Sequence, residues 1–229
     1  MTALDALDAI RHRRAVRTYT DRPVADADLD RLLRLALLAP TGHGAQSWSC
    51  VVVRAPERSA ALADLVLRGA AEYFRTFRPR AEGASDEEHA AWAHAYAEKA
   101  LGSYRQVPVW ICAVIVPRFH YPDDPLKEHI ERFGDVTSLA FALENLFVAA
   151  RAMGLGTTPT NFHFLLEEEY RELLRLPPEL GVHYLTPLGY PPEFPVGLRP
   201  ELAKARRPWR SLVHDEEWGL PRVDADAGA

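Results

Sequence analysis

Eight basic side chains fall into two seven-residue stretches, one near each end of this 229-residue chain. They are Arg11, Arg13, Arg14 and Arg17 in the first stretch, and Lys204, Arg206, Arg207 and Arg210 in the second. A guanidinium group binds two phosphate oxygens at once, and a lysine adds a point charge. The two stretches could therefore bind one small phosphorylated ligand if the fold brings them together. Two separate, solvated charged surfaces are the alternative that the pattern leaves open.

Histidine and cysteine give no sign of a metal site or a nucleophile. The 9 histidines lack the i, i+4 spacing with a carboxylate that a zinc helix needs, so we predict no metal. Cys50 and Cys112 lie in apolar runs with no activating histidine at a recognisable spacing. We expect two thiols in the core of a cytosolic protein and favour this over a buried disulfide. His43, in a glycine-flanked loop, is either an exposed turn residue or a ligand contact.

Composition narrows the class of protein. The formal net charge is −5, so the two basic stretches are local, and long basic tracts that would bind nucleic acid are absent. Asp5, Asp8 and Arg11 interrupt the first apolar residues, which argues against a signal peptide. No apolar run approaches the roughly 20 residues that span a bilayer. We predict a cytoplasmic protein that binds neither membrane nor nucleic acid.

The elements that would position these residues alternate irregularly between helix and strand. We expect helices over 3–13, from a cap at Asp26 to a stop at Pro40, over 62–77, over 86–104 and over 167–174. Apolar β-branched runs predict strands over 48–53, 109–116 and 182–188, and the second should be buried on both faces. Three short strands among long helices indicate an α+β fold.

The segment before the last strand holds the strongest helix signal. Residues 117–134 contain three prolines and are expected to form a loop or lid. A helix should then start at Asp135 or Thr137 and end at Gly154. It is apolar on nearly every side, so we expect it to be central or buried between subunits.

Four blocks of sequence stand out along the chain. They are Arg-Arg-Ala-Val-Arg-Thr-Tyr at 13–19, Ala-Pro-Thr-Gly-His-Gly-Ala-Gln-Ser-Trp at 39–48, Asn-Leu-x-x-Ala-Ala-x-x-x-Gly-Leu-Gly at 145–156, and Leu-Gly-Tyr-Pro at 188–191 with Lys-Ala-Arg-Arg-Pro at 204–208. In this order they resemble the FMN-dependent nitroreductase family over nearly the whole chain. The resemblance implies one nitroreductase-like domain over 1–229, with a helical insertion around 68–105 and an extended tail from about 192. It implies a central, mainly antiparallel sheet flanked by helices, in a homodimer with a long apolar interface helix.

The resemblance also implies FMN bound in the dimer interface. The cofactor-binding residues carried over by position are Arg13, Arg14, Ala15, Arg17, Gln46, Thr158, Pro159, Thr160, Asn161, Lys204 and Arg206. The arginines and the lysine would hold the 5′-phosphate, and a backbone N–H of the 158–161 turn could donate to flavin N5. Gln46 would lie near the pyrimidine edge or the ribityl chain, or would make a loop-to-strand hydrogen bond instead. Arg11, Arg207 and Arg210 are expected to be surface or structural residues.

The activity implied is reduction of a flat electron-poor acceptor (a nitroaromatic, quinone or enone) by NADH or NADPH in a ping-pong mechanism. No catalytic side chain is needed, since the flavin carries the chemistry. Ala15, Gly44 and Ser47 depart from the family pattern, and the changes at Ala15 and Gly44 remove two possible flavin hydrogen bonds. These departures keep open a flavin store or sequestering protein with little turnover, and a deazaflavin donor is a third possibility. Aromatic residues of the insertion could cover the flavin or pack between helices: Tyr73, Phe74, Phe77, Trp92, Tyr96 and Tyr104.

Overall fold

A computed structural model describes residues 4–198, 200–220 and 222 of the chain. The chain forms two compact units, Met1–Phe194 and Pro195–Ala229. The first unit holds the sheet and most of the helices, and the second begins three residues after the predicted start of the tail at about 192.

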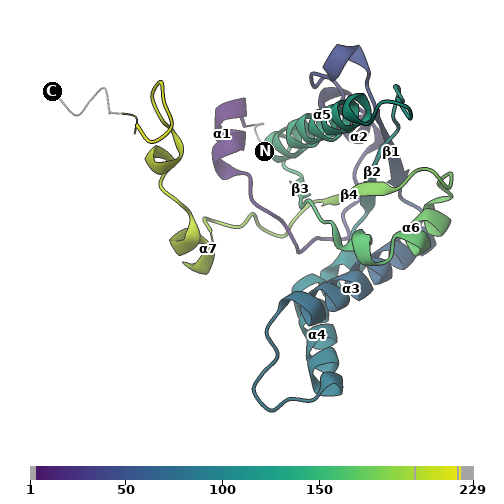
Figure 1. The fold of residues 1–229 in the computed structure, drawn as a ribbon. Helices are drawn as coiled ribbons and strands as arrows, with labels where there is room; N and C mark the ends of the chain where they lie inside the picture. Colours follow the sequence, from purple (N-terminus) through teal and green to yellow (C-terminus); the bar gives the residue numbers. More distant parts are fainter. Residues whose placement is uncertain (1–3, 199, 221, 223–229) are drawn as a thin grey trace. The chain divides into compact units, whose positions relative to one another are not determined.

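The first unit is built on one antiparallel sheet with the strand order β1-β2-β4-β3 (Figure 1). The strands are β1 (Trp48–Val53), β2 (Val109–Ile115), β3 (Gly156–Thr157) and β4 (Val182–Gly189). The α+β prediction and the three predicted strands are confirmed. We missed β3, because two residues are too few to show a period and its first residue is glycine.

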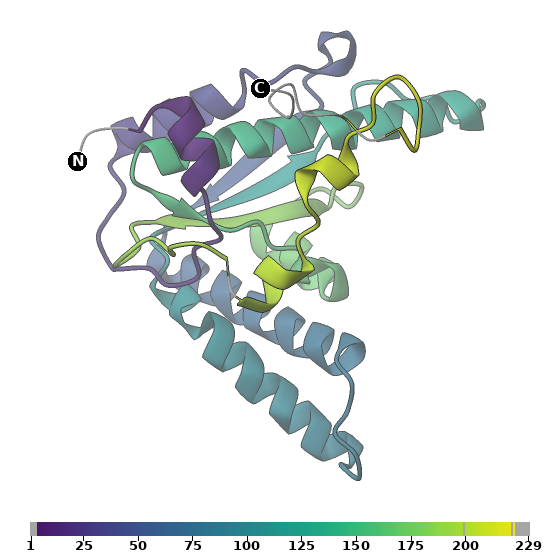
Figure 2. The same cartoon turned by 90° about the vertical axis from the view of Figure 1, so that its left-hand side faces the viewer.

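Helices cover both faces of this sheet (Figures 1 and 2). All seven residues of β2 are buried, as predicted for a strand covered on both sides. Trp110 and Cys112 join the hydrophobic cluster with α3, α4 and α6, while Ile111 and Ala113 join the one with α2 and α5. Cys50 packs with the second cluster and Cys112 with the first, and both thiols are free, as expected.

The helices before β2 are α1 (Ala6–His12), α2 (Asp26–Ala36), α3 (Pro56–Phe77) and α4 (Asp86–Leu101). The prediction that Asp26 caps α2 is wrong: Ala25 is the N-cap, without a side-chain hydrogen bond. Asp26 is the first helical residue instead and its carboxylate pairs with Arg54. An acidic side chain in the first turn still stabilises the positive end of the helix dipole.

Two of these helices also differ in length from their predictions. α3 begins at Pro56, six residues before the predicted start, because proline is well suited to the first helical position. α4 ends at Leu101 rather than 104, and the chain continues as a 3-10 helix, η2 (Gly102–Gln106). Within η2, Tyr104 is fully buried, so this aromatic packs in the core and does not cover a ligand.

The long helix α5 (Pro125–Ala152) corrects the largest error of the sequence analysis. We predicted an irregular segment over 117–134, but 125–134 are helical. Pro125 occupies the first helical position, and Asp124 caps the helix by accepting a hydrogen bond from the Lys127 N–H at 3.1 Å. A proline there begins a helix rather than breaking one. The helix ends as predicted, before Gly154 at φ 77°.

The surface of α5 is unusually apolar. In its amino-terminal part Leu126, Ile130 and Phe133 are 69%, 56% and 69% exposed, and Phe141 is exposed further along. Among the described residues it is also the one helix that by length and composition could cross a membrane. The core helix of a soluble protein passes the same test, and Leu139, Leu143 and Leu146 pack on the sheet.

The remaining helix of the first unit is α6 (Glu167–Leu174), which has its predicted bounds and follows the 3-10 helix η3 (Phe162–Leu165). The second unit contains α7 (Pro200–Ala205) and the 3-10 helix η4 (Trp209–Leu212). Its aromatic side chains are exposed, with Trp218 at 91%. Asp215, Glu216 and Glu217 belong to this unit, and the acidic residues beyond 222 lie outside the described residues.

Candidate functional site

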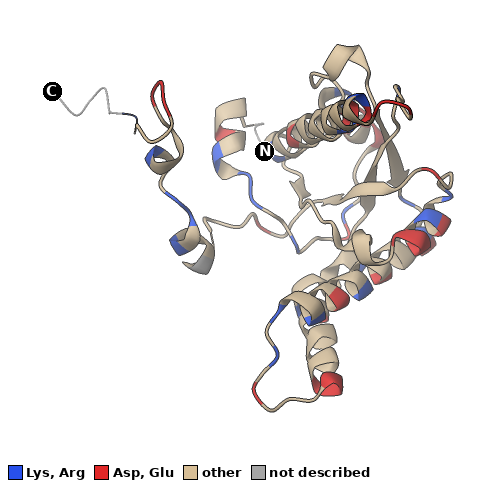
Figure 3. Ribbon diagram, in the orientation of Figure 1, with Lys and Arg blue, Asp and Glu red and all other residues tan. Residues whose placement is uncertain are grey.

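The first basic stretch runs from the last turn of α1 into an extended segment (Figure 3). Arg13 is the C-cap of α1, with an extended backbone, and its Nε lies 3.5 Å from Glu144 Oε1. Arg14 Nη1 donates to the carbonyls of Arg11 and Arg13 at 2.8 and 2.7 Å. These contacts hold the turn between helix and segment, while both side chains remain partly exposed and accessible to an anion.

The segment after Arg14 packs directly on β3. Ala15 forms a parallel bridge with Thr157, and the Val16 N–H donates to Thr157 O at 3.0 Å. Thr158 Oγ1 donates back to Val16 O. A Cβ at Gly156 would lie 2.8 Å from Val16 Cγ1, so only glycine allows this approach. The structure thus brings together two of the predicted contacts, the Arg13–Arg17 segment and the turn that starts at Thr158.

Tyr19 and Tyr104 are buried beside this contact. The sequence placed Tyr19 in the 13–19 block and Tyr104 among the aromatics that could cover the flavin or pack between helices, but it did not indicate that they support the segment. Tyr19 Oη donates to Val16 O at 2.7 Å, and its ring lies 6.0 Å from that of Tyr104. Burial raises the pKa of Tyr19 well above its usual value and that of Tyr104 to about 12, and the nearby Arg17 cation offsets part of each rise. Both hydroxyls therefore stay protonated. Tyr19 ends the 13–19 block, but no sequence pattern shows that its hydroxyl donates to Val16 O.

The 158–161 turn has fewer available amides than we expected. Pro159 has no N–H, and the Thr160 N–H donates to Leu185 O at 2.9 Å while Thr160 O accepts from the Leu185 N–H at 3.0 Å. The predicted donor to a flavin is then the N–H of Thr158 or Asn161.

Gln46 lies at the other edge of the sheet. Its φ of 51° is in the left-handed region, which is uncommon for residues other than glycine, and its N–H donates to Thr41 Oγ1 at 3.3 Å. The Trp48 N–H, at the start of β1, donates to Gln46 O at 2.8 Å, so a loop-to-strand hydrogen bond is present in the backbone of this residue. The side chain lines a cavity of about 400 Å³ between α2 and β1. The cavity is lined by Leu33, Leu37, Gln46, Trp48, Ser49, Cys50 and Val52.

One protomer does not bring Gln46 to the Ala15 segment. β1 and β3 are separated by three strand spacings, about 14 Å. Thr157 pairs with Leu188, Leu188 pairs with Val109, and Val109 is in register with the residue that follows Val53. That residue is eight positions beyond Gln46 in β1 and its loop. At about 3.3 Å per residue the two sites are also roughly 25 Å apart along the sheet. One ligand could contact both only if a second copy of the chain supplied one of them.

The second basic stretch belongs to the other unit. Lys204 is in the last turn of α7, and Arg206 follows the helix. Both are exposed, as are Arg207 and Arg210. Arg207 Nη2 donates to Ser211 O at 2.7 Å, which supports a structural role for it. Convergence of the two basic stretches on one phosphate stays a prediction.

His163, to which we gave no role, is fully buried in η3. Neither ring nitrogen has a hydrogen-bond partner among the residues that the structure describes. Burial, and to a smaller extent neighbouring His183, lower its pKa to about 4, while the nearby Val182 backbone, outside hydrogen-bonding geometry, offsets part of the fall. Within the described ranges, no group of three or more His, Cys, Asp or Glu side chains could hold a metal.

We expect His163 to make the protein less stable in mild acid. The folded-state pKa of about 4 is below the usual 6.5, so the unfolded chain binds the proton more readily. The free energy of unfolding should therefore fall as the pH drops from 6.5 to 4, by about 3 kcal/mol in total from this residue. Urea denaturation of wild type and His163→Leu across this range measures it.

The difference in stability between wild type and His163→Leu should change with pH in that window and be flat above it. His129→Gln, at an exposed histidine of α5, serves as the control for the loss of an imidazole from the surface. A constant difference between wild type and His163→Leu from pH 7 to pH 4 would contradict the assignment.

Comparison with known proteins identifies relatives along most of the chain. The sequence profile of the nitroreductase family matches residues 10–190. An NADH dehydrogenase of Thermus thermophilus is 29% identical over 206 residues, covering 84% of this chain and 90% of that protein.

Solved structures share the fold. A BluB-like flavoprotein from Clostridium difficile superposes with a TM-score of 0.70 at 18% identity, covering 93% of this chain and 100% of that one. The NADPH:FMN oxidoreductase of Vibrio harveyi, solved with NAD+, gives a TM-score of 0.64 at 19% identity, covering 96% and 80%. At these identities the likeness establishes the architecture alone.

Proposed function

This chain belongs to the nitroreductase family, and from that premise we propose that it is a cytoplasmic FMN oxidoreductase that uses NADH or NADPH to reduce a flat electron-poor acceptor. One observation carries the proposal: the Arg13–Arg17 segment and the Thr158 turn, far apart in sequence, are bonded to each other through Val16. A cationic segment beside a turn that offers the N–H groups of Thr158 and Asn161 suits a ligand that has a phosphate at one end and a flat polar ring at the other.

The residues present fit FMN. Arg13, Arg14 and Arg17 are partly exposed guanidinium groups, and with Lys204 and Arg206 they would hold the phosphate. The Thr158 or Asn161 N–H would face the ring. Ala15, which lacks the family hydroxyl, is held against β3 by its bridge to Thr157.

The proposed active form is a homodimer. Gln46 and the Ala15 segment lie at opposite edges of one sheet, so a single FMN can contact both only across two protomers. The apolar residues exposed on α5 would supply the interface, since a monomer rarely leaves so much apolar surface in water.

When bound, the flavin supplies hydride transfer, and the protein supplies binding, orientation and electrostatics. The arginines fix one end of the ligand, and Tyr19 and Thr158 hold the segment and the turn in one arrangement through Val16 O. Overall, NAD(P)H loses a hydride, and a quinone gains that hydride and one solvent proton to become the hydroquinone.

The test is a visible spectrum of the purified protein under anaerobic conditions. We expect a flavin band near ~450 nm that bleaches rapidly when NADH or NADPH is added and returns when a quinone follows. A yellow protein that does not bleach would support flavin storage, and one that bleaches only with a reduced deazaflavin would change the donor. A colourless protein that does not bind added FMN would refute the proposal.

A further inference from the structure

Three aromatic rings continue from the end of the 158–161 turn along α3. Phe162 follows Asn161 directly, its ring lies 5.6 Å from that of Tyr73, and Tyr73 lies 4.7 Å from Phe77. Exposure rises along this series: Phe162 is half-buried, Tyr73 is 39% exposed and Phe77 is 64% exposed. We call these three residues the aromatic strip.

The strip begins where α3 and η3 come into closest contact. A Cβ at Gly69 would lie 2.3 Å from the Phe162 carbonyl oxygen, so the two backbones touch at this point. Tyr73 and Phe77 are four and eight residues further along α3, one and two turns beyond the contact. The position of the strip relative to the turn is therefore set by backbone packing.

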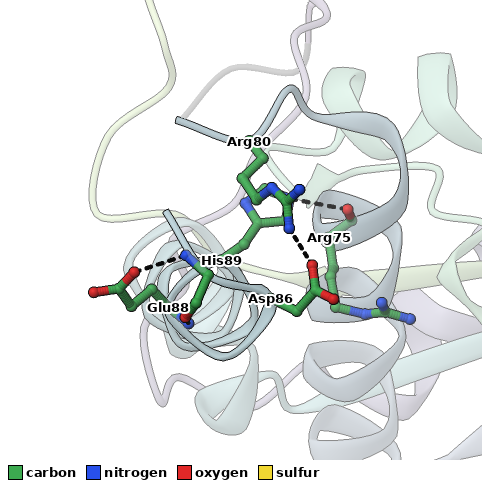
Figure 4. Close-up of polar contacts among 6 residues, drawn as sticks. Arg75, Arg80, Asp86, Glu88 and His89 are labelled. Atoms are coloured by element: carbon green, nitrogen blue, oxygen red, sulfur yellow. Dashed lines mark hydrogen bonds and ion pairs between the residues drawn. The ribbon is translucent and has the colours of Figure 1, made fainter. Parts of the chain in front are cut away.

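The hairpin of α3 and α4 that carries the strip is fixed at its tip (Figure 4). Ser85 and Glu88 form a capping box at the start of α4, and Arg80 pairs with Asp86. His89 Nε2 lies 3.0 Å from Arg75 O, which ties the start of α4 to the end of α3.

Further rings support the strip from within the hairpin. Phe74, on α3, lies 5.8 Å from Tyr73 and 4.8 Å from Tyr96 of α4. Tyr96 stacks on Trp92 at 5.4 Å, and Trp92 stacks on His89. Packing between helices, one of the two roles left open by the sequence, thus applies to Phe74 and Tyr96, while the ring of Phe77 remains largely exposed.

We propose that the aromatic strip is the acceptor-binding surface of the enzyme and that it selects planar acceptors of two or more fused rings. This rests on the proposed function, because it takes the 158–161 turn as the edge of the flavin site. A ring stacked on Tyr73 and Phe77 gains dispersion and quadrupole contacts that grow with its flat area. Because the tip fixes the hairpin, little ordering is needed when the acceptor binds.

The experiment compares two fully substituted quinones that cannot add to thiols, 2,3-dimethyl-1,4-naphthoquinone with two rings and tetramethyl-1,4-benzoquinone with one. In Phe77→Ala the ratio of kcat/KM for the two-ring over the one-ring quinone should fall about fivefold, and further in Tyr73→Ala/Phe77→Ala. Phe119→Ala is the matched control, since Phe119 is 41% exposed in the loop before α5, and it should keep the wild-type ratio. If the ratio in Phe77→Ala stays within twofold of wild type at normal flavin content, the proposal that the aromatic strip selects the acceptor is wrong.

A second measurement separates this proposal from the proposed function. Binding of the two-ring quinone to flavin-depleted protein, followed by quenching of intrinsic fluorescence, should also weaken about fivefold in Phe77→Ala. If the wild type binds the quinone through Phe77 but does not reduce it with NADH or NADPH, the proposed reductase activity is refuted and the acceptor-binding role of the aromatic strip is retained. If the wild type reduces both quinones, and Phe77→Ala changes neither the kcat/KM ratio nor quinone binding, the role of the aromatic strip is refuted and the reductase activity is retained.

Discussion

Replacing Arg13 and Arg206 together by alanine should release FMN and leave the protein folded. Each charge-assisted contact to a phosphate contributes about 1.5–3 kcal/mol, so losing two should weaken flavin binding by roughly 10²- to 10⁴-fold. The fold should persist, because the Arg13 guanidinium forms a 3.5 Å surface pair with exposed Glu144, and Arg206 is exposed. Flavin content after gel filtration and the Kd for added FMN measure the effect, and the elution volume reports the oligomer.

The matched control is Arg11→Ala with Arg207→Ala, which removes the same two charges from the same two stretches. Arg11 is 74% exposed beside Asp8, and Arg207 bonds to Ser211 O, so neither is expected to reach the ligand. This variant should retain flavin within about threefold of wild type, as surface ion pairs contribute little. Equal flavin loss in both variants would mean that net charge, and not a defined phosphate site, holds the cofactor.

The elements that local patterns predicted are those whose signal lies within one segment. β1 and α6 have the predicted bounds, since an apolar run or an amphipathic period is complete inside each. α5 was predicted too short because Pro125 reads as a breaker unless the cap at Asp124 is recognised first. β3 exists only through its partners, the Ala15 segment and the end of β4, so no local pattern could show it.

The candidate site divides in the same way. Residue type and spacing identified the arginine stretches, but the role of Tyr19 and Thr158 comes from a shared acceptor, Val16 O, that the fold alone brings to both. The small number of N–H groups that the 158–161 turn can offer to a ligand also depends on tertiary structure, because the Thr160 N–H donates to Leu185 O. The sequence around His163 does not indicate that its side chain is buried. It is buried because α6 covers it in the folded protein.

Gly69→Ala should be among the most destabilising single-methyl changes in the chain, although alanine is the better helix former. The added Cβ would lie 2.3 Å from the Phe162 carbonyl oxygen, and that atom is backbone, so η3 must move as a unit. Overpacking of this kind costs about 1–3 kcal/mol or more, against a gain of up to about 1 kcal/mol from helix propensity. We expect the free energy of unfolding to fall by roughly 2 kcal/mol, which lowers the Tm by about 4–8 °C for a chain of this size. Because Phe162 adjoins Asn161, flavin affinity should fall as well.

Gly134→Ala, inside α5 with nothing within 4 Å of its Cβ, is the control and should leave the Tm unchanged or slightly raised. If thermal unfolding shows the same Tm for both variants, the close approach of α3 to η3, and with it the position of the aromatic strip, is wrong.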